Sequence, residues 1–278
     1  MGIAKTFFVA ATFLAAARSV IAGTSKFTDL PGNPDLKSAS AIVLDESGNL
    51  IYGKDVDTVR PIASITKLMT AMVVLDSGIG LDEKVTITKE DRDLIRLTGS
   101  RLEYGATLSR REMILLALMS SENRAATALG RTYPGGMENF LVHMNRKARA
   151  LGMTNSHFAD PAGLKKENVS TAADLAKMVT AAEEYALITE ATTTRRKDVY
   201  PYKGRGNLTY GNTNRLLKNA SWDIELSKTG YINEAGRCLV MQANIEGEDV
   251  SIVLLNSFGK LTPYGDSNRL RKWMLANS

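Results

Sequence analysis

The sequence is poor in the residue types that form disulfides and hold metal ions. Its 278 residues include one cysteine, Cys238, which excludes an intramolecular disulfide and a cysteine-rich metal site. The two histidines, His143 and His157, lack the spacing of a metal hydrolase, and the Gly-x-Ser-x-Gly sequence of a serine esterase does not occur. We therefore expect no metal and no cofactor, and we interpret Cys238 as a core residue rather than a thiol nucleophile.

Proline, glycine and net charge are also limited. Seven prolines and 22 glycines exclude a collagen-like or low-complexity chain. A formal net charge of +5 is too small to indicate a nucleic-acid partner. The rest of the composition, 44% hydrophobic and 23% charged, indicates a folded globular protein with one large domain or two small ones.

The apolar run at the N-terminus is short. Residues 1–22 contain Lys5, the run Phe7–Ala17 and small residues ending at Ala22, which is typical of a secretory signal. The run falls below the ~20 apolar residues of a transmembrane helix, although a retained N-terminal anchor is the alternative. Loss of residues 1–22 would lower the formal charge from +5 to +3, because two basic residues and no acidic ones leave. Export with a single cysteine indicates a periplasmic protein of a bacterial envelope, and we expect no stable membrane anchor.

The remaining chain predicts one domain over residues 38–278. Residues 23–37 are polar and contain Pro31-Gly32-Asn33-Pro34, so we interpret them as a linker. Strand patterns occur at both ends of the domain, and a mostly helical lobe at about 76–194 is inserted between the sheet-forming segments 38–75 and 195–278. This order predicts an α/β protein of the α+β type, with one antiparallel sheet assembled from both chain ends.

Individual elements follow from periodicity and from turn residues. The helix after Pro61 has apolar residues at helical spacing from Ile65, and the capping box Ser109–Glu112 starts another helix. Further helices are expected at 137–151, 172–182 and 267–275, and strands at 40–44, 50–52, 222–227, 237–246 and 249–255.

Lys67 is the only charged residue between Pro61 and Leu75, in a helix that is apolar on nearly every side. Such a helix is buried, and burial lowers the pKa of a lysine so that its neutral amine can accept a proton. The alternative is a lysine that extends its amine from the rim of the core to solvent. Ser64 lies one turn earlier, at the helix N-terminus, where free N–H groups stabilise an oxyanion. We therefore predict Ser64 as a nucleophile activated by Lys67.

Two other motifs could complete such a site. Ser121-Glu122-Asn123 interrupts two helical runs, although a turn capped by Ser121 would explain it too. Lys228-Thr229-Gly230 is predicted to end a strand in which Trp222, Ile224 and Leu226 place Lys228 on the apolar face. Gly230 would permit close approach of a ligand, although a strand simply turning at glycine is the alternative. A second Ser-x-x-Lys pair, Ser257 and Lys260, follows a strand and is interpreted as a chance copy.

The three motifs occur in the order Ser64-x-x-Lys67, Ser121-x-Asn123 and Lys228-Thr229-Gly230, which is the signature of penicillin-binding proteins and class A β-lactamases. Together with Phe158–Leu164 and Asn212–Asn214, they make the sequence similar to the low-molecular-mass penicillin-binding proteins, the D-alanyl-D-alanine peptidases of the serine S11 family. The similarity extends from about Ser38 to Trp273. It implies a DD-peptidase/β-lactamase-like fold, with an antiparallel sheet flanked by helices and a mostly helical lobe.

The resemblance also implies roles for the motif residues. Ser64 would be acylated, Lys67 would act as its general base, and Ser121 would relay a proton to the leaving amine. Asn123 would orient Lys67 and the substrate amide. The carboxylate of the leaving residue would be held by Lys228 and Thr229, beside Gly230, and the oxyanion by the backbone N–H groups of Ser64 and Tyr231. Peptidoglycan stem peptides would be the substrates, and β-lactam antibiotics would be covalent inhibitors.

The resemblance leaves several activities open. Glu122 is shared by the endopeptidase branch of the family, where many carboxypeptidases have glycine or alanine. The chain also ends soon after its last helix, without the second β-domain and anchor of typical carboxypeptidases. We therefore expect an endopeptidase that cleaves D-alanyl-diaminopimelate cross-links, with a D-alanyl-D-alanine carboxypeptidase as the alternative. A β-lactamase is disfavoured because residues 155–164 lack the Glu-x-x-Leu-Asn loop, and a non-catalytic penicillin-recognising protein is the remaining possibility.

Overall fold

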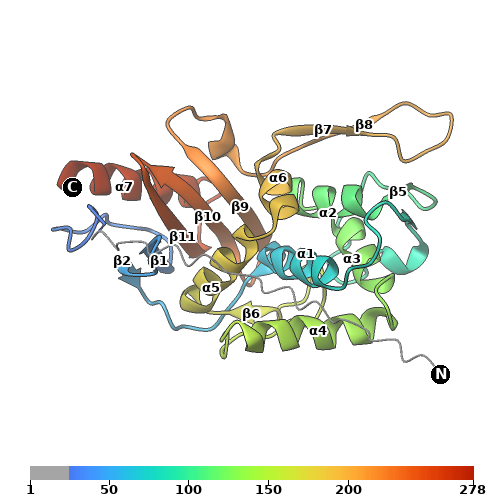
Figure 1. Ribbon diagram of the computed structural model, residues 1–278, viewed down its shortest axis with the longest axis horizontal. Coiled ribbons are helices and arrows are strands. Elements are labelled where there is room, and N and C mark those ends of the chain that lie inside the picture. Colours follow the sequence, from blue (N-terminus) through green and yellow to red (C-terminus); the bar gives the residue numbers. More distant parts are fainter. Residues whose placement is uncertain (1–24) are drawn as a thin grey trace, which may run out of the picture.

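The computed structural model describes residues 25–278. The predicted signal, residues 1–22, lies outside the described residues. Five antiparallel strands form the main sheet in the order β2-β1-β11-β10-β9, so strands from both chain ends lie side by side as predicted (Figure 1). Their bounds are β1 Ser40–Asp45, β2 Leu50–Lys54, β9 Asp223–Ile232, β10 Gly236–Ile245 and β11 Glu248–Ser257.

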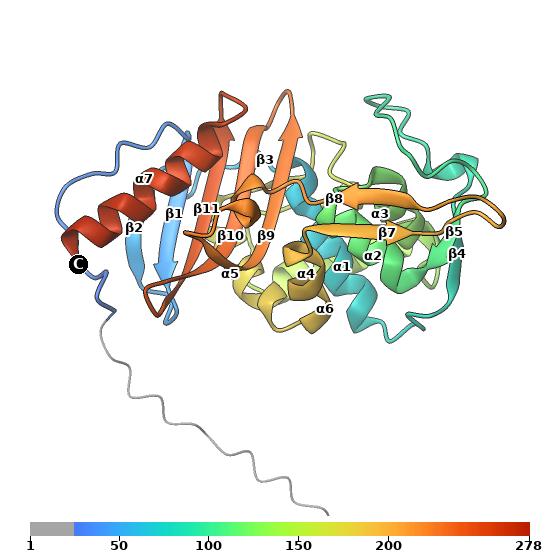
Figure 2. The same cartoon turned by 90° about the horizontal axis from the view of Figure 1, so that it is seen from above.

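Helices cover both faces of this sheet. The C-terminal helix α7 packs on one face, and α5 with the helical lobe lies on the other (Figure 2). The expected helices are present, and the capping box is confirmed because Ser109 Oγ accepts a hydrogen bond from Glu112 N at 3.2 Å. Their bounds are α1 Thr66–Asp76, α2 Arg110–Met119, α3 Asn123–Arg131, α4 Gly136–Ala150, α5 Ala172–Glu183, α6 Ala186–Thr193 and α7 Thr262–Asn277.

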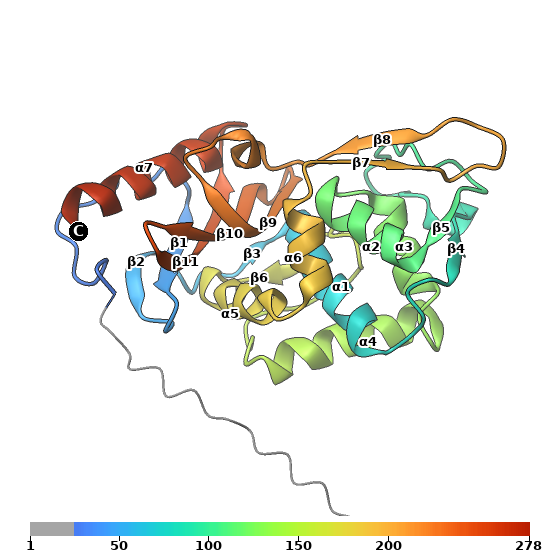
Figure 3. The same ribbon diagram turned by 45° about the horizontal axis from the view of Figure 1, so that its top comes forward.

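Shorter elements connect and cover the helical lobe. The hairpin of β7 and β8 extends along this lobe beside β5 (Figure 3), and Thr107 N donates to Pro201 O at 2.9 Å. Within residues 25–278 no helix is both long and apolar enough to cross a bilayer. The short elements are β3 Arg60–Pro61, β4 Lys84–Thr86, β5 Thr107–Ser109, β6 Val169–Ser170, β7 Arg196–Val199 and β8 Leu208–Gly211, with 3-10 helices η1 Ala63–Ile65, η2 Lys89–Asp91 and η3 Arg215–Lys218.

The segment predicted as a linker is part of the folded body over its described residues. Phe27 and Leu36 are buried in the core between the sheet and α7. Trp273 Nε1 of α7 also donates to Pro31 O at 2.8 Å. The prediction of a linker was wrong because two isolated apolar residues in a polar segment leave no periodic pattern, yet both reach the core.

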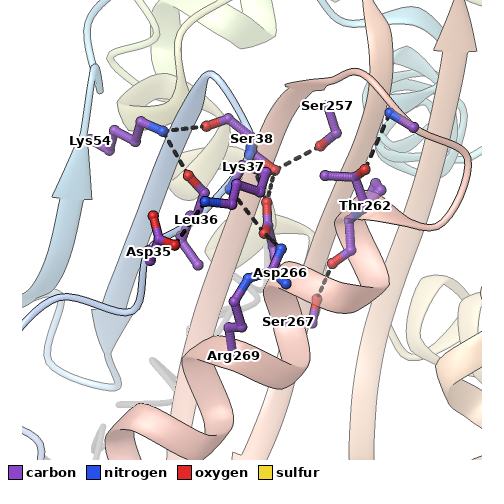
Figure 4. A network of polar contacts seen from close by, with 12 residues as sticks. Asp35, Leu36, Lys37, Ser38, Lys54, Ser257, Thr262, Asp266, Ser267 and Arg269 are labelled. Carbon is purple, nitrogen blue, oxygen red and sulfur yellow. Dashed lines mark hydrogen bonds and ion pairs between the residues drawn. The ribbon is translucent and has the colours of Figure 1, made fainter.

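A buried carboxylate ties this N-terminal segment to α7. Asp266 accepts hydrogen bonds from Lys37 N at 3.0 Å and from Ser38 N at 2.7 Å, and it contacts the guanidinium of Arg269 (Figure 4). Ser38 Oγ also lies 2.7 Å from Ser257 Oγ. Ser257 is fully buried in this network, which gives the serine of the second Ser-x-x-Lys pair a structural role.

Strand β9 departs from the predicted alternation. It continues to Ile232, so Lys228-Thr229-Gly230 lies inside the strand. The prediction that this motif ends the strand was wrong. The register with β10 shifts at Glu225, which is a β-bulge, and Ile224 and Leu226 therefore face opposite sides of the sheet. Lys228 is on an apolar face as predicted, but it shares that face with Leu226 and the helical lobe, whereas Ile224 belongs to the face under α7.

Candidate active site

Ser64 and Lys67 lie where η1 runs into α1. Lys67 is fully buried, and its Nζ lies 2.8 Å from Ser64 Oγ. The same nitrogen lies 2.8 Å from Asn123 Oδ1 and 2.5 Å from Ala162 O. The amine is thus held by three oxygens from three segments of the chain, and the alternative of an amine extended to solvent is wrong.

The surroundings of Lys67 suit a proton acceptor. Burial lowers the pKa of Lys67 from 10.5 to about 7, and the negative charges of Asp160, Glu122 and Asp93 oppose part of this effect. A neutral amine has two N–H donors and one lone pair. Asn123 Oδ1 and Ala162 O can only accept, so they take the two donors, and the lone pair is left for the hydroxyl proton of Ser64. The arrangement can therefore deprotonate Ser64 near neutral pH.

The carbonyl of Ala162 is presented by a tight turn. The Asp160 carboxylate accepts hydrogen bonds from the backbone N–H groups of Ala162 at 2.7 Å, Gly163 at 2.6 Å and Lys165 at 2.7 Å. Gly163 has φ +78°, and a Cβ there would lie 1.9 Å from the carbonyl oxygen of Ala63. The sequence analysis used Phe158–Leu164 only as part of the family resemblance and assigned no role to Asp160, Ala162 or Gly163, although Asp-Pro-Ala-Gly is a recognisable turn sequence.

The connection between α2 and α3 brings Ser121 and Asn123 to the same place. Ser121 has a left-handed φ of +61°, a strained conformation of the kind found at functional sites. Its Oγ accepts a hydrogen bond from Lys228 Nζ at 3.0 Å. Ser121 does not cap the helix: the side chain of Glu122 does so, by accepting from Arg124 N at 3.2 Å. The alternative that Ser121 is a capping residue is therefore wrong.

Strand β9 forms the opposite side of the site. Lys228 is buried, and both burial and the positive charge of Lys67 hold its pKa well below the ordinary value. Thr229 Oγ1 donates to Thr213 Oγ1 at 2.6 Å. A Cβ at Gly230 would lie 2.9 Å from Ile62 O and 3.2 Å from the backbone nitrogen of Ser64, so glycine is what allows β9 to approach η1.

These residues surround a cavity of about 320 Å³. Lys67 and Lys228 do not line it, but each is hydrogen-bonded to a serine that does. No cluster of three metal-ligating side chains occurs within residues 25–278. Six of the eight residues predicted from the sequence line the cavity, namely Ser64, Ser121, Asn123, Thr229, Gly230 and Tyr231, and the prediction missed Thr213, Arg215, Arg237 and Lys260.

A buried lysine beside an accessible serine, with a second lysine–serine pair across the cavity, defines a serine acyl-transfer site. A family model described as D-alanyl-D-alanine carboxypeptidase, of the peptidase S11 family, matches residues 28–259. The chain belongs to this family and is a serine-type D-alanyl-D-alanine peptidase, which confirms the predicted family and its fold.

Relatives and solved structures agree with this assignment. A D-alanyl-D-alanine endopeptidase of Pseudomonas aeruginosa is 47% identical over 262 residues, which cover 94% of this chain and 84% of the relative. A D-alanyl-D-alanine endopeptidase of Escherichia coli is 46% identical over 242 residues, covering 87% of this chain and 78% of the relative. The crystal structure of a Streptomyces DD-transpeptidase is similar with a TM-score of 0.82 at 29% identity, covering 88% of this chain and 100% of that chain.

Proposed function

We propose that the protein is a D-alanyl-D-alanine endopeptidase that hydrolyses peptide cross-links of peptidoglycan through an acyl-enzyme on Ser64. The position of Lys67 Nζ, 2.8 Å from Ser64 Oγ and also bonded to Asn123 and Ala162, is the observation that carries the acyl-transfer chemistry. The choice of an endopeptidase is supported by the names of the relatives at 46–47% identity.

In the proposed acylation, neutral Lys67 takes the proton of Ser64 while Oγ attacks the carbonyl carbon of the penultimate D-alanine. The backbone N–H groups of Ser64 and Tyr231 stabilise the oxyanion of the tetrahedral intermediate. The closeness of β9 to η1 at Gly230 supports this pairing, because it brings the two backbone segments to the same side of the cavity.

The leaving amine departs on the side of Ser121. Ser121 Oγ, which accepts a hydrogen bond from Lys228 Nζ at 3.0 Å, relays a proton. It gives its own proton to the departing nitrogen and takes up the one that Lys67 removed from Ser64, so that Lys67 returns to the neutral amine. The carboxylate next to that nitrogen is bound by Thr229 Oγ1 and attracted by Lys228. Water then attacks the acyl-enzyme, with Lys67 again accepting a proton, and Ser64 is released.

The first test is labelling with fluorescent penicillin. We expect wild type to become labelled and Ser64→Ala to remain unlabelled, with Ser257→Ala as the matched control that keeps the label. Equal labelling of wild type and Ser64→Ala would exclude Ser64 as the nucleophile. Mixing with nitrocefin distinguishes a β-lactamase: we expect a single slow turnover, and fast multiple turnover would refute the peptidase assignment.

The second test separates the endopeptidase from a carboxypeptidase. The carboxypeptidase is the alternative because the matching family model is described as D-alanyl-D-alanine carboxypeptidase. Purified muropeptides are digested with the protein, and the products are separated by chromatography and identified by mass spectrometry. We expect cross-linked dimers to be converted to monomers without release of D-alanine from pentapeptides. Release of D-alanine with intact dimers would establish the carboxypeptidase instead.

We propose that residues 1–22 direct export and that the enzyme works in the periplasm, where its substrate is located. Support comes from the charged start, short apolar run and small-residue end of this segment. Fractionation of cells that express the full chain tests the proposal. We expect a shortened protein in the periplasmic fraction, and an uncleaved protein in the cytoplasm would refute it.

A further inference from the structure

The cavity beside Ser64 carries more positive charge than one substrate carboxylate requires. Arg215 of η3, Arg237 of β10 and Lys260, which follows β11, all line it. Among residues 25–278, no aspartate or glutamate lines the same cavity. We call these three side chains the cationic wall, and a surface of this kind attracts anionic ligands.

Protein carboxylates do not neutralise the cationic wall. Within the described part of the chain, none of its three members forms an ion pair, whereas nearby Arg96 pairs with Glu234 at 2.9 Å. Arg215 and Lys260 are exposed to solvent. Their charges are thus available to a ligand that enters the cavity.

The position of Arg237 is fixed by an aromatic contact. Its guanidinium carbon lies 3.7 Å from the centroid of the Tyr231 ring, on the neighbouring strand. Both arginines also act on Tyr264 of the cavity lining: burial raises the pKa of Tyr264, and the positive charges of Arg215 and Arg237 counteract it. The fold therefore directs charges from η3 and β10 toward one region.

The two possible leaving groups differ in charge. Free D-alanine has one carboxylate, adjacent to the departing amine, and penicillin likewise presents one carboxylate; the proposed mechanism assigns this group to Thr229 and Lys228. In a cross-link, the departing amine belongs to a diamino acid within a second stem peptide. That peptide carries further carboxylates, which lie beyond the one bound at Thr229.

We propose that Arg215 and Arg237 bind these further carboxylates of the departing peptide and thereby favour cross-linked substrates over terminal D-alanine. The inference rests on the proposed endopeptidase function and names the part of the substrate that sets its preference. A planar guanidinium matches a carboxylate through two parallel hydrogen bonds, which gives arginine an advantage over lysine at this position.

The test compares Arg215→Gln/Arg237→Gln with wild type. Arg146→Gln/Arg149→Gln on α4 is the matched control, because it removes the same charge from a helix that does not line the cavity. Three rates are measured for each protein: cleavage of a cross-linked dimer, release of D-alanine from a pentapeptide, and acylation by fluorescent penicillin.

We expect kcat/KM for the dimer to fall at least about tenfold in the cavity variant, while D-alanine release and penicillin acylation change less than about threefold. The control variant should match wild type in all three rates. A parallel loss of all three rates in the cavity variant would overturn the proposal, because it would show a general structural role. An unchanged rate on the dimer would overturn it as well.

A further measurement separates failure of this inference from failure of the proposed function. If wild type leaves the dimer intact, the endopeptidase assignment fails. Binding of a stem peptide to the cavity is then measured by how strongly the peptide slows acylation by penicillin. A stem tetrapeptide with free carboxylates is compared with its amidated form for slowing penicillin acylation of wild type. Stronger protection by the free form, lost in Arg215→Gln/Arg237→Gln, supports the cationic wall, and equal protection by the two forms overturns it.

Discussion

The pH dependence of Ser64 acylation follows directly from the burial of Lys67. The pKa of this lysine falls from 10.5 to about 7. Because one pH unit corresponds to about 1.4 kcal/mol, protonating Lys67 in the folded protein is about 5 kcal/mol less favourable than in water. With a pKa of about 7, roughly one tenth of the lysine is neutral at pH 6, and roughly one hundredth at pH 5.

The rate of acylation by penicillin should follow this neutral fraction. We expect it to rise about tenfold per pH unit from pH 5 to pH 6 and to level off above pH 8. Stopped-flow measurement with fluorescent penicillin under pseudo-first-order conditions gives the profile. A rate that stays constant between pH 5 and pH 8 would refute the reasoning, because it would show that Lys67 is not the group that accepts the proton.

Glu122→Gln offers a directional check of the same prediction. The negative charge of Glu122 raises the pKa of Lys67, so its removal should move the rising part of the profile to lower pH. Glutamine can still accept the hydrogen bond from Arg124 N that caps α3. A shift to higher pH, or no shift, would contradict the electrostatic account of this site.

Stability should change with pH for the same reason. The pKa of Lys67 is lower in the folded than in the unfolded protein, so between about pH 7 and pH 10.5 the unfolded protein binds the proton more readily. The free energy of unfolding is therefore highest above pH 10.5 and decreases as the pH falls toward about 7. Lys67→Met cannot titrate. The difference in free energy of unfolding between the two proteins, measured with urea, should therefore change by up to about 5 kcal/mol over this range, and a constant difference would contradict the prediction.

Three further predictions follow from other contacts. Gly163→Ala should reduce acylation at least about tenfold, because its Cβ would meet Ala63 O at 1.9 Å and displace the segment before Ser64; wild-type rates would contradict this. Asp266→Asn should lower the free energy of unfolding in urea by about 2–4 kcal/mol, since the buried carboxylate joins residues 37–38 to α7, and an unchanged midpoint would show that this network is dispensable. Burial raises the pKa of Cys238 to about 11, so iodoacetamide at pH 8 should label it only after denaturation, as mass spectrometry can show.

Much of the fold could be predicted from the sequence because its signals are local. Helical periodicity and the capping box at Ser109 located the helices, and alternation with turn residues located the strands of the main sheet. The bulge at Glu225 could not be predicted, because it depends on how β9 pairs with β10. Phe27 was missed for a related reason: its burial depends on α7, more than 200 residues away in the chain.

The candidate site divides in the same way. The motif residues Ser64, Lys67 and Ser121 could be proposed from the sequence, because a lysine in an apolar helix and a polar break between helices are unusual wherever they occur. The carbonyl of Ala162 left no such signal, because any residue supplies a carbonyl and only the turn at Asp160 directs it at Lys67.

The sequence by itself predicted the chemistry, since its three motifs resemble those of the S11 family and Lys67, alone in an apolar helix, is the candidate base for Ser64. Only the tertiary structure decided where charges act. It buries Lys67 deeply enough to lower its pKa, and it gathers Arg215, Arg237 and Lys260 from separate segments around one cavity. The reason is physical: residue types and local spacing are written along the chain, but dielectric surroundings and distances between remote charges exist only after folding.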